Sequence, residues 1–96
     1  MTAKEAKQYL AGNDGYGYFK YVKVCGEYRF AESHEINFDH GFLANNETVE
    51  SAAHIQVNPS GVKIEGYSMK LKIGPDAADY ERLPELFGLP LLWDFD

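Results

Sequence analysis

The chain has 96 residues, enough for one domain with one modest hydrophobic core and too few for two domains. Hydrophobic residues make up 45% of the chain and aromatic residues 15%, which excludes a disordered protein. The formal net charge is −6, and the single cysteine, Cys25, excludes an intramolecular disulfide and a zinc site built only from cysteines.

The first predicted element is a helix at about residues 3–11. Thr2 and Glu5 have the spacing of a capping box, and good helix formers follow them as far as Gly12. A glycine-rich turn then leads into a strand at residues 16–24, which is rich in aromatic and β-branched side chains. Both faces of this strand carry apolar groups, which predicts that the sheet is covered on both sides there.

The middle of the chain predicts a first hairpin followed by a loop. Residues 25–27 form its connection, and polar and apolar side chains alternate from Tyr28 onward, with an interruption expected at residues 32–33. Glycine and asparagine residues at positions 41, 45 and 46 indicate a loop.

The second half of the chain predicts another hairpin and a short helix. Strands at residues 53–57 and 62–64 flank a sequence typical of a type I turn. Residues 67–73 alternate again, with apolar side chains at the odd positions, and predict a further strand. A helix follows at about residues 77–83, with Asp76 placed to cap it.

These elements predict an α+β fold. It has an antiparallel sheet of four to five strands, with a short N-terminal helix and a short C-terminal helix packed on it. The single domain, residues 1–96, divides into a helix and turn (1–15), an antiparallel sheet (16–73) and a short helix with an apolar, acidic segment (74–96).

The acidity lies in that last segment. Residues 1–72 hold 8 basic and 9 acidic side chains, a balance of −1, whereas residues 73–96 hold Arg82 against six acidic side chains, a balance of −5. Because termini fray unless they dock, the apolar residues here predict docking on the chain's own core or on a partner, and a basic partner would suit the acids. The candidate binding residues are Leu89, Leu91, Leu92, Trp93 and Phe95.

A cluster of imidazole and carboxylate groups supplies the candidates for catalysis. Such groups can carry out acid–base chemistry or bind a metal ion. On a strand, however, His34 and His40 would lie about 20 Å apart, at ~3.3 Å per residue. We therefore expect no metal site and no cofactor. The weak catalytic candidates are His34, Glu35, Asp39, His40 and His54.

Residues 15–21 resemble part of the aromatic octamer of RNA-recognition motifs and cold-shock domains. Their glycines and rings match that octamer, but Asp14 stands at its basic position and Phe19 at its aliphatic one. Rings that alternate along a strand can stack on unpaired bases, so this resemblance implies an aromatic platform. Few basic residues lie nearby, and nucleic acid is not the expected partner. The candidate platform residues are Tyr16, Tyr18 and Tyr21.

The sequence favours a non-catalytic protein-binding or regulatory module that acts as a homodimer, because one strand is apolar on both faces and the C-terminal segment is apolar. The alternatives are a small enzyme or ligand-binding domain that uses the histidine cluster, and a single-stranded nucleic-acid binder. We expect a cytoplasmic protein without a membrane span, since no apolar run is long enough for one and a lone thiol suits a reducing compartment.

Overall fold

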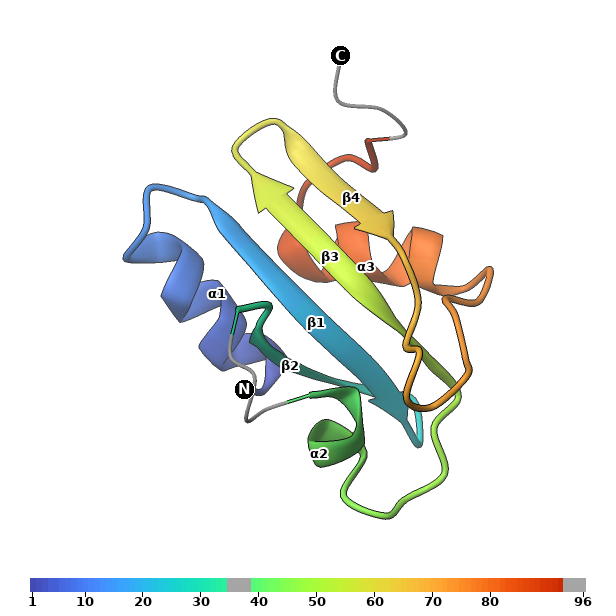
Figure 1. Ribbon diagram of the computed structural model, residues 1–96. Helices are drawn as coiled ribbons and strands as arrows, with labels where there is room; N and C mark the ends of the chain where they lie inside the picture. Colours follow the sequence, from blue (N-terminus) through green and yellow to red (C-terminus); the bar gives the residue numbers. More distant parts are fainter. Residues whose placement is uncertain (35–38, 93–96) are drawn as a thin grey trace.

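Four antiparallel strands and three helices make up the part of the chain that the computed structural model describes, residues 1–34 and 39–92 (Figure 1). The predicted α+β class is confirmed, with an N-terminal and a C-terminal helix beside one antiparallel sheet. In chain order the elements are α1 (Ala3–Ala11), β1 (Gly17–Val24), β2 (Glu27–Glu32), α2 (His40–Ala44), β3 (Ser51–Asn58), β4 (Gly61–Glu65) and α3 (Asp79–Phe87).

The sheet consists of two hairpins joined side by side. Its strand order is β2-β1-β3-β4, so β1 and β3 form the centre and pair with each other. The β1–β2 hairpin turns through Cys25 and Gly26, whose φ values of 51° and 77° fit a two-residue turn of type I′. In the β3–β4 hairpin, Oδ1 of Asn58 accepts hydrogen bonds from the backbone N–H groups of Ser60 and Gly61.

The main hydrophobic core lies between the sheet and the helices α1 and α3, which cover the same face (Figure 1). Side chains alternate between the two faces of a strand, so Phe19 and Tyr21 of β1 enter this core together with Ile55 of β3. Leu10 of α1 and Leu83 of α3 complete its helical side. Burying one such large side chain stabilises the fold by about 1.5–3 kcal/mol.

The opposite face is covered at one end by a smaller cluster. Val22 and Val24 of β1 pack there with Ala52 of β3 beneath Leu43 of α2, and Ile73 packs against the same cluster. The predicted cover on both sides of this strand is therefore confirmed for its second half.

The predicted N-terminal helix at residues 3–11 is confirmed as α1, and so is its capping box. Oγ1 of Thr2 accepts from the backbone N–H of Glu5 at 3.2 Å, and the Glu5 carboxylate accepts from that of Thr2 at 2.9 Å. These two bonds satisfy backbone groups that the first turn of a helix leaves without partners.

The predicted strand at residues 67–73 is wrong. β4 ends at Glu65, and Gly66 with φ 69° turns the chain out of the sheet. Ser68 and Ile73 then close a tight loop through two backbone hydrogen bonds of 2.8 and 3.3 Å. Of the odd-numbered apolar side chains, Leu71 and Ile73 pack on the smaller cluster, whereas Tyr67 and Met69 are exposed.

Two helices differ from the prediction. The predicted loop near position 40 contains α2, which begins after Asp39, whose carboxylate accepts from the backbone N–H of Phe42 at 2.8 Å. The C-terminal helix α3 begins later than predicted and continues through Pro84 to Phe87. No helix within the described ranges is long and apolar enough to cross a membrane.

Each outer strand is paired with a segment near one end of the chain. On β2, the backbone N–H of Phe30 donates to Met1 at 2.8 Å, and the Met1 amine donates back to the Phe30 carbonyl at 2.5 Å. On β4, the N–H of Val62 donates to Pro90 at 2.9 Å, and that of Leu92 donates to Val62 at 2.7 Å. Another strand therefore cannot pair with the sheet at Phe30 or Val62 without displacing these segments.

Candidate functional site

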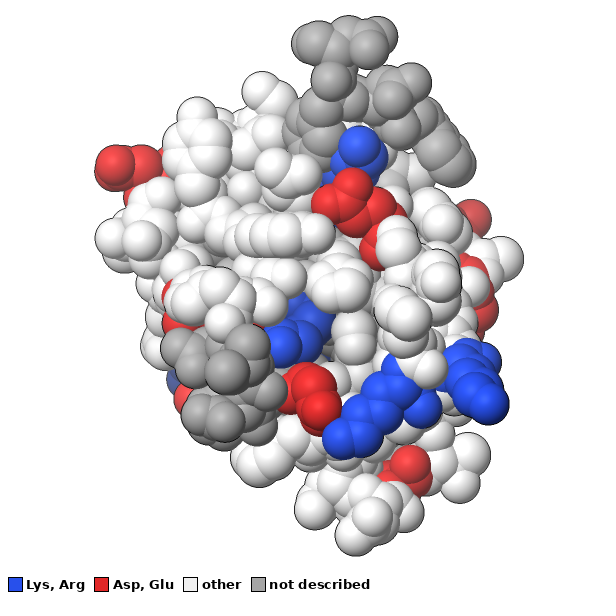
Figure 2. Space-filling model, viewed as in Figure 1, with Lys and Arg blue, Asp and Glu red and all other residues white. Residues whose placement is uncertain are grey.

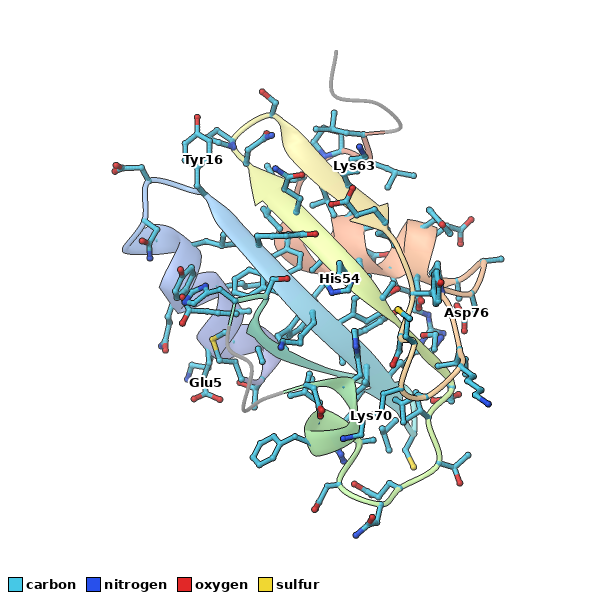
Figure 3. The ribbon with its side chains drawn as sticks, in the orientation of Figure 1. Glu5, Tyr16, His54, Lys63, Lys70 and Asp76 are labelled. Carbon is cyan, nitrogen blue, oxygen red and sulfur yellow. The ribbon has the colours of Figure 1, made fainter. Side chains whose placement is uncertain are left out.

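The face of the sheet that carries α2 also holds a polar area beyond this helix. We call it the open patch, and Figure 3 shows one member, His54, near its centre. Tyr18 is 47% exposed there, whereas Lys20 is only 6% exposed. The open patch has two rows in register across β1, β3 and β4: Tyr18, Gln56 and Lys63, then Lys20, His54 and Glu65.

Charges of both signs alternate over this face (Figure 2). Within the open patch, Nζ of Lys63 lies 3.6 Å from the carboxylate of Glu65. At the border with α2, Nζ of Lys70 lies 3.0 Å from the carboxylate of Asp39. The acidic net charge of the chain is therefore not concentrated on this face.

Two histidines meet at the border between α2 and the open patch. The rings of His40 and His54 pack edge to face with their centroids 5.1 Å apart, and the Tyr18 ring lies 6.0 Å from that of His54. Nε2 of His40 donates to the carbonyl oxygen of Ala53 at 2.8 Å, which fixes the proton on that nitrogen. His40 thus links α2 to the central strand β3.

The surroundings of both rings favour their neutral forms. Burial lowers the pKa of His40, and Lys20 lowers it further against the opposing effects of the Ala53 hydrogen bond and of Asp39. Burial also lowers the pKa of His54, with His40 and Lys20 acting in the same sense and Glu65 opposing them. At neutral pH the pair is therefore uncharged.

Of the predicted catalytic candidates, the structure brings His40 and His54 together and places Asp39 directly before His40. The His34 side chain is 72% exposed and lies 4.0 Å from Glu32. Asp39 caps α2, and Glu35 lies outside the described residues. Among residues 1–34 and 39–92, no group of three or more histidine, cysteine or acidic side chains could hold a metal ion.

The three candidate platform tyrosines do not share one surface. Tyr16 is 60% exposed and precedes β1, whereas Tyr18 belongs to the open patch. Tyr21 is fully buried on the opposite face of the sheet, because it lies three positions after Tyr18 on a strand whose side chains alternate between the faces. The proposed platform is therefore corrected to exposed rings at Tyr16 and Tyr18 alone.

The apolar C-terminal segment docks on the chain itself over its described part. Leu91 forms a parallel bridge with Val62 of β4, and Leu89 and Leu91 pack against the main core. Leu92 lies against Gly61, where an added Cβ would come within 2.6 Å of its side chain. Trp93 and Phe95, the other predicted binding residues, lie outside the described residues.

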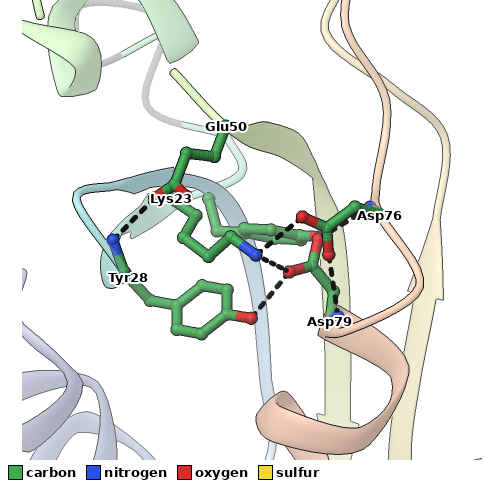
Figure 4. Close-up of polar contacts among 7 residues, drawn as sticks. Lys23, Tyr28, Glu50, Asp76 and Asp79 are labelled. Carbon is green, nitrogen blue, oxygen red and sulfur yellow. Dashed lines mark hydrogen bonds and ion pairs between the residues drawn. The ribbon is translucent and has the colours of Figure 1, made fainter. Parts of the chain in front are cut away.

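A buried polar network on the α1–α3 face was not predicted from the sequence (Figure 4). Asp79 at the start of α3 is fully buried and accepts hydrogen bonds from the hydroxyls of Tyr21 at 2.8 Å and Tyr28 at 2.6 Å. Nζ of Lys23 lies 3.4 Å from Asp79 and 2.6 Å from Asp76. The alternation of β1 contained a signal, because it places Lys23 on the same face as two buried rings.

Hydrogen bonds keep the Asp79 carboxylate charged despite its burial. Burial alone would raise the pKa of Asp79, but the hydroxyls of Tyr28 and Tyr21 lower it below its usual value. Burial would likewise lower the pKa of Lys23, but Asp76 and Asp79 raise it. Because these donors and acceptors are paired with one another, we interpret the network as an anchor that holds α3 to the sheet.

Comparison with known proteins finds no family model that matches the chain and no curated protein or solved structure that is similar to it.

Proposed function

We propose that this chain is a non-catalytic protein-binding module that acts as a homodimer, with the open patches of two copies in contact. One observation carries the proposal: the open patch presents a ring, Tyr18, that is 47% exposed next to half-buried His54. Exposed tyrosine with limited conformational freedom is a frequent anchor at protein interfaces.

The charges of the open patch favour a second copy as its partner. The chain as a whole carries −6, so general contact between two copies is repulsive. On this face, however, Lys63 neighbours Glu65 and Lys70 neighbours Asp39. A twofold axis through the patch can place lysines of one copy opposite acids of the other, which makes the surface complementary to itself.

The covered edges of the sheet also favour contact through the face. The segments paired with Phe30 of β2 and Val62 of β4 occupy backbone groups that a strand from another molecule would need. Contact through the open patch requires no displacement of either segment.

We further propose that the protein works in a reducing compartment, in keeping with a cytoplasmic location. Its one cysteine, Cys25, is exposed and unpaired at the tip of the β1–β2 hairpin. An exposed thiol is open to oxidation, and a reducing compartment protects it. Fractionation of cells that express the full chain tests the location.

Sedimentation equilibrium over a range of concentrations tests the homodimer. We expect the wild-type chain to form dimers and Tyr18→Glu to remain monomeric, because it places a carboxylate in the centre of the contact. Loss of one aromatic anchor typically costs about 2 kcal/mol or more of binding free energy. Tyr16→Glu makes the same change on a ring that is 60% exposed and lies at the end of the sheet (Figure 3), and we expect it to dimerise normally.

Two results would contradict the proposal. A wild-type chain that stays monomeric at every concentration would exclude the homodimer. If Tyr18→Glu dimerises and Phe42→Glu does not, the contact lies elsewhere. Phe42 is 57% exposed and lines a groove of ≈ 910 Å³ between α2 and the start of α1, which is the competing surface.

A further inference from the structure

The His40–His54 pair lies where the proposed contact would form. His54 is a member of the open patch, and His40 packs against it from the first residue of α2. His40 has only limited freedom to turn away, because its Nε2 is bound to the carbonyl oxygen of Ala53 at 2.8 Å. A proton added to His40 therefore stays next to His54 at the edge of the open patch.

The charged groups around the pair come from three elements. Lys20 of β1 acts on both rings, Asp39 at the start of α2 acts on His40, and Glu65 of β4 acts on His54. Asp39 also accepts a hydrogen bond from Lys70. The positive charge of Lys70 therefore offsets part of the attraction that Asp39 exerts on a protonated His40. Tyr18 of β1 adds a ring next to His54 but no charge at neutral or acidic pH.

We infer that protonation of the His40–His54 pair separates the two copies, so that the homodimer forms at neutral pH and weakens in mildly acidic solution. This inference rests on the proposed function, since it concerns the same contact. In the neutral state His54 offers a ring to the partner copy. After protonation, each copy brings a new positive charge beside Lys20 into a contact that excludes water and faces the same charge on the partner.

The size of the effect follows from linkage between protonation and association. If the contact lowers the pKa of one histidine by one unit, its protonation costs 1.36 kcal/mol of association, about a tenfold change in the dissociation constant. Both copies contribute, so we expect the dissociation constant to rise by about a hundredfold once one ring of each pair is protonated. The change occurs as the pH falls through the range in which histidine titrates.

Sedimentation equilibrium at about pH 7.5 and about pH 4.5 tests the inference, because the surroundings lower the pKa of both rings below the ordinary histidine value. We expect the wild-type dimer to weaken at the lower pH. His54→Phe keeps a ring but cannot take a proton, which leaves His40 as the titrating ring of the pair, so its dimer should weaken less than that of the wild type at the lower pH. His34→Gln removes a histidine that is 72% exposed and lies beside Glu32, so it should respond to pH as the wild type does.

The outcomes separate this inference from the proposed function. A wild-type dimer that is equally strong at both pH values overturns the inference and leaves the homodimer standing. Loss of the response in His34→Gln overturns it as well. A chain that is monomeric at both pH values overturns the proposed function and the inference together. If His54→Phe does not fold, His54→Gln serves in its place, with the same expected reduction of the response.

Discussion

Lys23 and Asp76 are 53 residues apart in the chain, yet Nζ of Lys23 lies 2.6 Å from the carboxylate of Asp76. This contact joins the central strand β1 to the segment that leads into α3. Asp79 completes the network one helical turn later, fully buried beneath the hydroxyls of two tyrosines. The position of α3 on the sheet thus depends on polar contacts as well as on the packing of Leu83.

Removing one hydroxyl from this network should destabilise the fold. We expect Tyr21→Phe and Tyr28→Phe each to lower the free energy of unfolding by about 1.5–3 kcal/mol, because each loses a hydrogen bond to a charged group. Asp79→Ala should cost more, about 3–5 kcal/mol, because it leaves Lys23 buried without one of its counter-charges. Denaturation in urea, followed by circular dichroism, measures these changes.

Tyr16→Phe is the matched control for the two tyrosine variants. Its hydroxyl is on a side chain that is 60% exposed, so the free energy of unfolding should change by less than about 0.5 kcal/mol. Equal effects of Tyr16→Phe and Tyr28→Phe would show that the network does not anchor α3.

The same network predicts how stability depends on acid pH. The pKa of Asp79 in the folded chain lies below the ordinary value of 3.8, so the unfolded chain binds its proton first as the pH falls. The contribution of Asp79 is complete above pH 3.8 and is lost as the pH falls through the folded pKa. Urea denaturation at a series of acidic pH values should show a shallower loss for the double variant Tyr21→Phe/Tyr28→Phe, and an unchanged slope would contradict this account.

Gly61→Ala should detach the C-terminal segment from β4. An added Cβ would lie 2.6 Å from both the carbonyl oxygen of Pro90 and the side chain of Leu92, so the segment has to move. We expect a loss of about 1–3 kcal/mol in the free energy of unfolding, as for other overpacked sites. Hydrogen exchange should show faster exchange of the Val62 N–H, which donates to Pro90.

Gly12→Ala is the control for that change. Its backbone has φ −83°, and an added Cβ meets no atom closer than 3.6 Å. Stability and exchange at Val62 should therefore stay unchanged. The account fails if both alanine variants leave the Val62 N–H equally protected.

Elements stabilised by local interactions could be predicted from the sequence. The helix α1 was evident from the capping box of Thr2 and Glu5, and both hairpins from their turn residues. The strand predicted at residues 67–73 shows the limit, because alternating apolar residues indicate burial but not which element buries them. The helix α2 is too short to show a periodic pattern, and Asp39 as its N-cap was its one local signal.

The candidate site depends on contacts between distant segments, which is why it could be predicted only in part. A strand that extends through position 40 would hold His34 and His40 far apart. Instead, β2 ends at Glu32, and α2 places His40 against His54 of β3. Lys20 was not recognised as part of the surface, although it lies two positions after Tyr18 on β1 and therefore on the same face. Its neighbours His54 and Glu65 become evident only once the pairing of β1, β3 and β4 is known.

The segments that pair with Phe30 and Val62 also limit how large an assembly of this chain can become. A free outer strand accepts another strand, which exposes an edge of its own, so that addition repeats without limit. Contact between two open patches related by a twofold axis uses the same surface on both copies and stops at two. If two copies pair through the open patch as proposed, the protected positions on the edges favour a closed pair over a growing fibre.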